Sequence, residues 1–124
     1  MWIFANDAFV SIVKHTGGPG LFMVRARIAG DLERLFPGAE VVETPDADYR
    51  YRVTLPAYLV ADVIREQVAG IDYPNFKGSV RDDERHRVYS SVWSVMYDWQ
   101  YRAVQRLKAT QKKARKARAV SLFD

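Results

Sequence analysis

The loop-forming residues Thr16–Gly20 separate two β-rich segments, 9–15 and 21–28, and this pattern constrains the fold more than any other in the chain. A short loop rich in glycine and proline between two such segments predicts a β-hairpin, which requires an antiparallel sheet. In the second segment every other side chain is apolar. We therefore expect one face of this strand to lie in a core: Phe22, Val24, Ala26 and Ile28.

The chain from residue 21 to residue 70 continues in the order β-α-β-β-α. Asp31 is expected to cap a short helix, 40–44 and 49–55 read as strands, and Pro56 opens a helix that ends at Gly70. This order is most of a ferredoxin-like unit, and 9–15 is available as the missing strand. The predicted fold is α+β, with an antiparallel sheet of about four to five strands, helices on one face and a long C-terminal helix.

A long helix is expected over 80–107, with Ser79 and Asp82 as a capping box. Apolar residues recur along it at helical spacing: Val88, Val92, Val95, Met96, Trp99, Ala103 and Leu107. A second face carries rings at a spacing of four, which makes four residues candidates for an interface: Tyr89, Trp93, Tyr97 and Tyr101. Both faces need cover, either from the rest of the chain or from a second subunit in a dimer.

The charge of the chain is unevenly distributed. The net charge is +4, but residues 101–124 hold eight basic side chains and one acid, +7, whereas residues 1–100 are net −3. We expect a single domain over 1–107 and a basic tail over 108–124 that is partly helical or disordered. Such a tail favours nucleic acid or another polyanion as a partner, although it could also act only as a solubilising terminus. Its candidate contacts are Lys112, Lys113, Arg115 and Lys116.

A second set of polyanion-binding candidates lies on two strands. Arg25 and Arg27 share one strand face, and so do Arg50 and Arg52. Arginines on an open sheet face can bind nucleic acid, but stacking platforms also need aromatic rings. Tyr49 and Tyr51 are expected on the opposite face. The alternative is a solvated surface on which the arginines pair with acids: Glu40, Glu43 or Asp48.

Composition excludes several classes of site. The chain has no cysteine, which excludes disulfides, thiol catalysis and thiolate zinc centres. No apolar run approaches the roughly 20 residues that a membrane span needs. The start, MWIFANDAF, lacks a basic segment and is not expected to be a signal peptide, so a cytoplasmic location is predicted. No cofactor, metal or membrane partner is expected.

The loop 71–78 and the helix start after it hold the only candidates for a reactive site: Asp72, Asn75, Lys77, Arg85 and His86. His86 could act as a general base oriented by an acid. However, Asp82 and His86 are four residues apart, which also suits an ordinary surface pair. Two histidines without metal-ligand spacing make no metal site.

Several segments of residues 1–99 resemble a family of short, uncharacterised bacterial proteins. They are MWIF with FVSIV, VRARIAGDLERLFP, TPDADYRYRV, and IDYPNFKGSV followed by R-H-x-x-Y-x-x-V-W-S-V-M-Y. The resemblance implies a bacterial or phage-like, intracellular origin. It brings no activity, cofactor, partner or catalytic residue.

The sequence thus predicts a small intracellular binding or interaction module that contacts nucleic acid or another polyanion through its basic tail. Two alternatives remain open at this point. One is a small enzyme with a site around residues 72–86, and the other is a dimeric regulatory or inhibitor protein.

Overall fold

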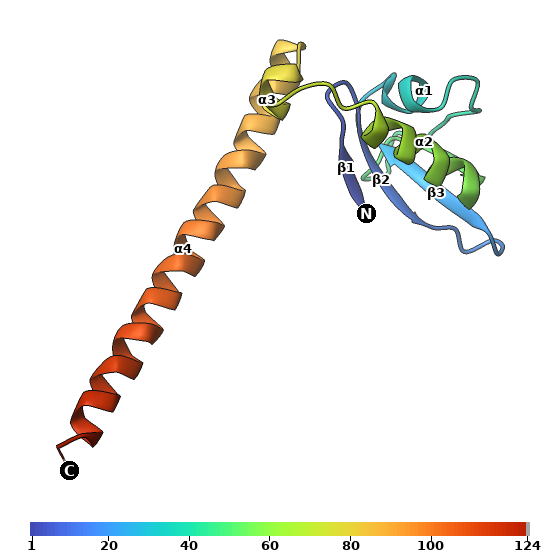
Figure 1. Ribbon diagram of the computed structural model, residues 1–124. Helices are drawn as coiled ribbons and strands as arrows, with labels where there is room; N and C mark the ends of the chain where they lie inside the picture. Colours follow the sequence, from blue (N-terminus) through green and yellow to red (C-terminus); the bar gives the residue numbers. More distant parts are fainter. Residues whose placement is uncertain (124) are drawn as a thin grey trace. The chain divides into compact units, whose positions relative to one another are not determined.

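The computed structural model describes residues 1–123 (Figure 1), and Asp124, the end of the predicted tail, lies outside the described residues. Contacts group the chain into two units, Met1–Asp83 and the part that begins at Glu84. This division differs from the single domain over 1–107 that we expected. Each unit is therefore described by itself.

The first unit contains a five-stranded antiparallel sheet in the order β1-β2-β3-β5-β4. The strands are β1 (Trp2–Phe4), β2 (Phe9–Lys14), β3 (Leu21–Ala26), β4 (Val42–Glu43) and β5 (Tyr51–Pro56). The helices of the chain are α1 (Asp31–Leu35), α2 (Ala57–Ala69), α3 (Phe76–Ser79) and α4 (Asp83–Ser121). The predicted α+β class and the predicted 9–28 hairpin are confirmed.

β5 lies between β3 and β4, so the elements from β3 to α2 form the split β-α-β arrangement that the sequence order predicts. β2 pairs antiparallel with the free edge of β3, as expected for the segment 9–15. β1 adds one further strand beyond β2.

α1 and α2 cover the same face of the sheet and form the core with it (Figure 1). Val24 and Val53 are cross-strand neighbours on that face, Val10 of β2 lies on the same face, and each of the three is at most 5% exposed. Leu32 of α1 and Val60 of α2 pack against them. The alternation in β3 is therefore confirmed for Val24 and Ala26, and Phe22 packs at the core margin.

The alternation fails one step later. β3 ends at Ala26, and Ile28 is 57% exposed. Our placement of Ile28 in the core was wrong because the backbone leaves the extended conformation before that residue.

Asp31 does not cap α1. The capping position is Gly30, which has a φ of 90° that suits glycine, and Asp31 is the first helical residue. The Asp31 carboxylate is fully buried, accepts a hydrogen bond from the Phe9 backbone N–H at 2.9 Å, and lies 2.7 Å from Nη1 of Arg34. It joins α1 to β2 and stabilises a tertiary contact instead of a helix end.

The ends of α2 lie where the sequence predicts, since Pro56 precedes the first turn and Gly70 is the C-cap. The predicted capping box at Ser79 is wrong. Ser79 ends the short helix α3, and its hydroxyl donates to the Phe76 carbonyl at 2.6 Å. A separate turn of helix thus comes between the 71–75 loop and α4.

α4 is one continuous helix of 39 residues that extends well past residue 107. The part of the predicted tail up to Ser121 is therefore helical. Within residues 1–123, no helix combines the length and the apolar character that a bilayer crossing requires.

Candidate polyanion-binding surfaces

The sheet face opposite the core carries a row of side chains that crosses all five strands. Strand register makes Trp2, Ser11, Arg25, Arg52 and Val42 successive cross-strand neighbours. Directly opposite residues in antiparallel strands point to the same side of the sheet. Neighbouring strands lie about 4.8 Å apart, so the row is about 19 Å long.

Tyr49 lies on this same side, against the arginines. The expectation that it points to the opposite face was wrong, because β5 begins at Tyr51 and the alternation does not extend back to Tyr49. The carbon at the centre of the Arg25 guanidinium lies 4.4 Å from the Tyr49 ring centroid, and that of Arg27 lies 4.0 Å away. Tyr49 is only 4% exposed, so these cation–π contacts are largely shielded from water. Tyr51, by contrast, packs against the core as expected.

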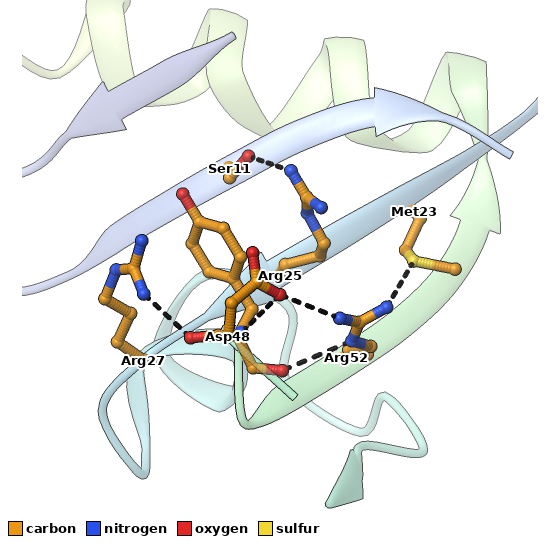
Figure 2. Close-up of polar contacts among 7 residues, drawn as sticks. Ser11, Met23, Arg25, Arg27, Asp48 and Arg52 are labelled. Carbon is orange, nitrogen blue, oxygen red and sulfur yellow. Dashed lines mark hydrogen bonds and ion pairs between the residues drawn. The ribbon is translucent and has the colours of Figure 1, made fainter. Parts of the chain in front are cut away.

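Asp48 and the backbone of Tyr49 hold the arginines in place (Figure 2). The Asp48 carboxylate accepts from Nη2 of Arg52 at 3.2 Å and from the Tyr49 N–H at 2.9 Å. The Asp48 carbonyl accepts from Arg27 at 2.7 Å, and Arg52 donates through Nε to the Tyr49 carbonyl at 3.2 Å. The loop before β5 is thus folded over the arginines.

Arg25 keeps unused hydrogen-bonding capacity. Its Nη2 donates to the hydroxyl of the buried Ser11 at 2.9 Å, whereas its Nε is buried without a hydrogen-bond partner within residues 1–123. Arg25 also lies directly opposite Arg52, and like charges in that position repel each other. Only Arg52 pairs with the Asp48 carboxylate, whereas Arg27 donates to the Asp48 carbonyl and Arg25 lies over the Tyr49 ring. The cluster of three arginines therefore carries a surplus of positive charge.

Arg50 is separate from this cluster. It pairs with Glu43 at 2.7 Å, with both side chains about half exposed, and the hydrogen bond and charge of Glu43 raise the pKa of Arg50 above its ordinary value. Glu40, the other acid considered for pairing, has no ion pair among the described residues. The predicted acid pairing therefore accounts for Arg50 and in part for Arg52.

Three aromatic rings at the β1–β2 end of the open face were missed from the sequence. Phe4 lies opposite Phe9, with ring centroids 4.5 Å apart, and Trp2 meets the Phe9 ring edge at 6.1 Å. Trp2 is 64% exposed. The signal was present, because extending the hairpin pattern to residues 2–4 places Trp2 and Phe4 on the face that carries Ser11.

The predicted tail contacts Lys112, Lys113, Arg115 and Lys116 all lie in α4, and every described residue from Arg102 onwards is exposed. No acidic residue occurs between Arg102 and Phe123. At 100° per residue, Arg102, Arg106 and Lys113 fall within about 40° of one another on the helix. This segment is therefore an exposed, strongly basic helix that contains no acidic residue between Arg102 and Phe123.

The loop-site candidates take local roles and fall in both units. Asn75 caps α3 by accepting from the Gly78 N–H at 3.3 Å, Lys77 lies within α3, and Asp72 is exposed in the loop before it. In the second unit Arg85 donates to the Tyr89 hydroxyl at 3.1 Å, and His86 is exposed on α4. These contacts order the loop and the helix start, and they do not define a reaction.

The four interface candidates differ in exposure. Tyr89 is buried, whereas Trp93, Tyr97 and Tyr101 are each at least half exposed. The Trp93 and Tyr97 rings stack on each other, with centroids 5.3 Å apart and planes within 12°. The other stripe, expected to face a core, is exposed as well: Val88, Val92, Val95, Met96, Trp99 and Leu107.

Within residues 1–123 no group of three potential ligands that could hold a metal ion is present. No family model, curated protein or solved structure matches this chain. The resemblance to short bacterial proteins and the cytoplasmic location therefore stay predictions.

Proposed function

We propose that the protein is a nucleic-acid-binding module whose main contact is the basic C-terminal part of α4. The observation that supports this most strongly is that α4 continues as a helix through an exposed, acid-free segment with eight cations. A high density of exposed cations without acids between them suits a phosphate backbone, whose neutralisation releases condensed counterions.

The dimensions of the helix fit this role. From Arg102 to Lys116 the axis is about 21 Å long, at 1.5 Å per residue. The helix extends to Ser121, so its cations are held at fixed positions along one axis before a ligand binds. Contacts of this kind position a protein without reading the base sequence.

The test measures the affinity of the full chain for a labelled duplex over a range of salt concentrations. Replacing Lys112, Lys113, Arg115 and Lys116 with glutamine should weaken binding by about 10- to 100-fold at low salt and flatten its salt dependence. The slope should fall by roughly 0.9 for each phosphate that the variant no longer neutralises. Equal affinity and slope in the two proteins would exclude the proposal.

A matched control separates position from total charge. Lys112→Gln with Lys113→Gln removes two exposed charges from α4, and Lys14→Gln with Arg65→Gln removes two exposed charges from the first unit. Only the first pair should weaken binding. Equal losses would mean that net charge, and not the α4 segment, drives the association.

A second candidate function, self-association, is favoured by the exposed apolar segment of α4 between Val88 and Leu107. Soluble monomers rarely expose such a large contiguous apolar surface. Trp93, Met96, Trp99 and Ala103 outline an open hollow of about 460 Å³ on this helix. A small residue among large ones offers a hole for a knob from a partner helix.

The partner in this second candidate is α4 of another copy, in antiparallel orientation. Aligning residues 88–107 with the same residues of the second copy places Lys112 opposite Asp83. A parallel pair would instead bring together two cationic segments, which repel each other. The dimer would carry one basic segment at each end.

A further inference from the structure

The open sheet face, defined by the row from Trp2 to Val42 and the adjoining Arg27, Asp48 and Tyr49, combines features that its role in folding does not require. α1 and α2 pack on the opposite face, and on this side Ser11 and Tyr49 are buried, so the accessible part of the face consists of Trp2, Arg27 and Val42 with part of Arg52. Trp2 is 64% exposed, and the Arg52 side chain keeps 29% of its accessible surface. A large exposed ring and partly exposed arginines are therefore available to a ligand.

The surplus of positive charge on this face favours an anionic ligand over another protein surface. Arg25 and Arg52 repel each other across the strands, and Asp48 neutralises only one charge of the three-arginine cluster. An anionic oxygen near the guanidinium groups would relieve this repulsion.

The aromatic end of the row identifies the kind of anion. Trp2, backed by Phe9, presents a ring on the same face as the arginines, and unpaired nucleobases stack on such rings. At the other end, a hollow of about 580 Å³ lies beside Arg52 and is lined in part by Met23, Val42 and Thr54. An aromatic ring at one end of the row and cationic side chains in its middle are complementary to the bases and phosphates of a single strand.

We infer that the open sheet face is a binding surface for single-stranded nucleic acid, with Trp2 as a base-stacking residue and Arg25, Arg27 and Arg52 as phosphate contacts. Paired bases are stacked within a duplex and do not offer a free face to Trp2. The inference is independent of the basic segment of α4. It adds a second surface, with a preference for unpaired strands.

The test compares a fluorescent oligothymidylate with its duplex form on the full-length chain. Trp2→Ala should weaken single-strand binding about tenfold and leave duplex binding within about twofold. Arg27→Gln should weaken it about fivefold, and Trp2→Phe should restore most of the affinity because a ring is kept. Trp2 is exposed at the sheet edge, so Trp2→Ala is expected to fold, and circular dichroism checks this.

The controls lie on the opposite side of the unit. Tyr58, 72% exposed, and Arg65, also exposed, both belong to α2. Tyr58→Ala and Arg65→Gln should each change single-strand affinity less than about twofold. Losses in these variants equal to those of Trp2→Ala and Arg27→Gln would overturn the inference.

A direct readout places the strand on Trp2. In a chain with Trp93→Phe and Trp99→Phe, Trp2 is the only tryptophan. Stacking should quench its fluorescence with the same affinity that the labelled strand reports. Saturated binding without quenching would overturn the inference.

Two further outcomes distinguish the sheet face from the basic segment of α4 and from a peptide-binding surface. If glutamine substitutions in α4 weaken single-strand binding but Trp2→Ala does not, the sheet-face inference fails and the proposed function stands. The reverse pattern would support the sheet face, and loss of duplex binding in the α4 variants would then remain the separate test of the proposed function. If an oligoglutamate peptide binds as tightly and loses affinity in the same variants, the face recognises acidic peptides and the inference is wrong.

Discussion

Residues 1–83 and α4 contain similar apolar side chains, but the first unit buries many of them, whereas Tyr89 is the one buried residue among the described residues of α4. Leu32 is 1% exposed and Leu107 is 58% exposed, although both belong to helices with apolar spacing. Amphipathic periodicity indicates that one face of a helix packs against another apolar surface. It does not indicate whether that surface belongs to the same chain or to another molecule. The partner of α1 is the sheet of its own unit, whereas the second unit contains no element besides α4 among residues 84–123 to cover the apolar face of that helix.

The charges show the same contrast. Arg27 and Arg52 find acceptors at Asp48 and Tyr49, and Arg50 pairs with Glu43. The cations beyond Arg102 have no acid within their own segment. These arginines of the first unit therefore have acceptors within the unit, whereas the basic segment of α4 has no acidic residue of its own between Arg102 and Phe123.

The largest expected difference between the units concerns a matched pair of leucines. Leu32→Ala should lower the free energy of unfolding of the first unit by about 3 kcal/mol, because it leaves a cavity in the core. Leu107→Ala should change it by less than about 0.5 kcal/mol. Urea unfolding followed by circular dichroism measures both, and similar losses would show that the two units do not differ as described.

The next comparison is between a buried aspartate, Asp31, and an exposed one, Asp62. Asp31→Ala leaves the Phe9 N–H without its acceptor and should cost about 2–3 kcal/mol. Asp62, whose side chain is 69% exposed and lies 3.9 Å from Arg65, is the control, and its replacement by alanine should cost less than about 0.5 kcal/mol. Thermal melts compare the variants. A stable Asp31→Ala protein would mean that the β2–α1 link is dispensable.

Strand periodicity predicted most of the first unit. Alternation in β3 identified Val24 and Ala26 as core, and the Thr16–Gly20 loop indicated the antiparallel pairing of β2 with β3. The error at Tyr49 came from continuing the alternation two residues before β5. A loop can turn a side chain to either face, and nothing in the local pattern reports the contact with Arg25 and Arg27.

Long-range contacts were the other information that the sequence lacked. Asp31 has the chemistry of a helix cap, and only the fold shows that Phe9, 22 residues earlier, donates to it. The row from Trp2 to Arg52 could be partly assembled by extending the hairpin register to β1. Joining β3 to β5 in register required the tertiary structure.

If α4 mediates self-association, substitutions on α4 should weaken the dimer and substitutions on the first unit should not. Trp93→Glu should weaken a dimer by about 2 kcal/mol, roughly 30-fold, because a charge enters an apolar interface. Tyr58→Glu, on α2, should have no effect. Sedimentation at micromolar concentration measures both proteins, and a strictly monomeric parent chain would exclude the dimer.

The orientation of that dimer has its own test. The chain has no cysteine, so Leu122→Cys introduces a single site for a spin label. Antiparallel helices should hold the two labels more than about 40 Å apart, given 1.5 Å per residue along α4. A short label-to-label distance would indicate parallel pairing.

The smallest expected effect is the response of the two units to salt. Screening reduces repulsion among the α4 cations. The helix beyond Arg102 should therefore become more stable by a few tenths of a kcal/mol per turn between low and high salt. The stability of the first unit should change little.

Lys112→Glu places an acid four residues from both Lys108 and Lys116, and should stabilise this part of α4 by about 0.5 kcal/mol while reversing its salt response. Residue-specific chemical shifts measure helicity in each unit separately. A basic segment whose helicity ignores both salt and Lys112→Glu would mean that its cations do not repel one another, and the contrast in charge between the two units would lose its physical basis.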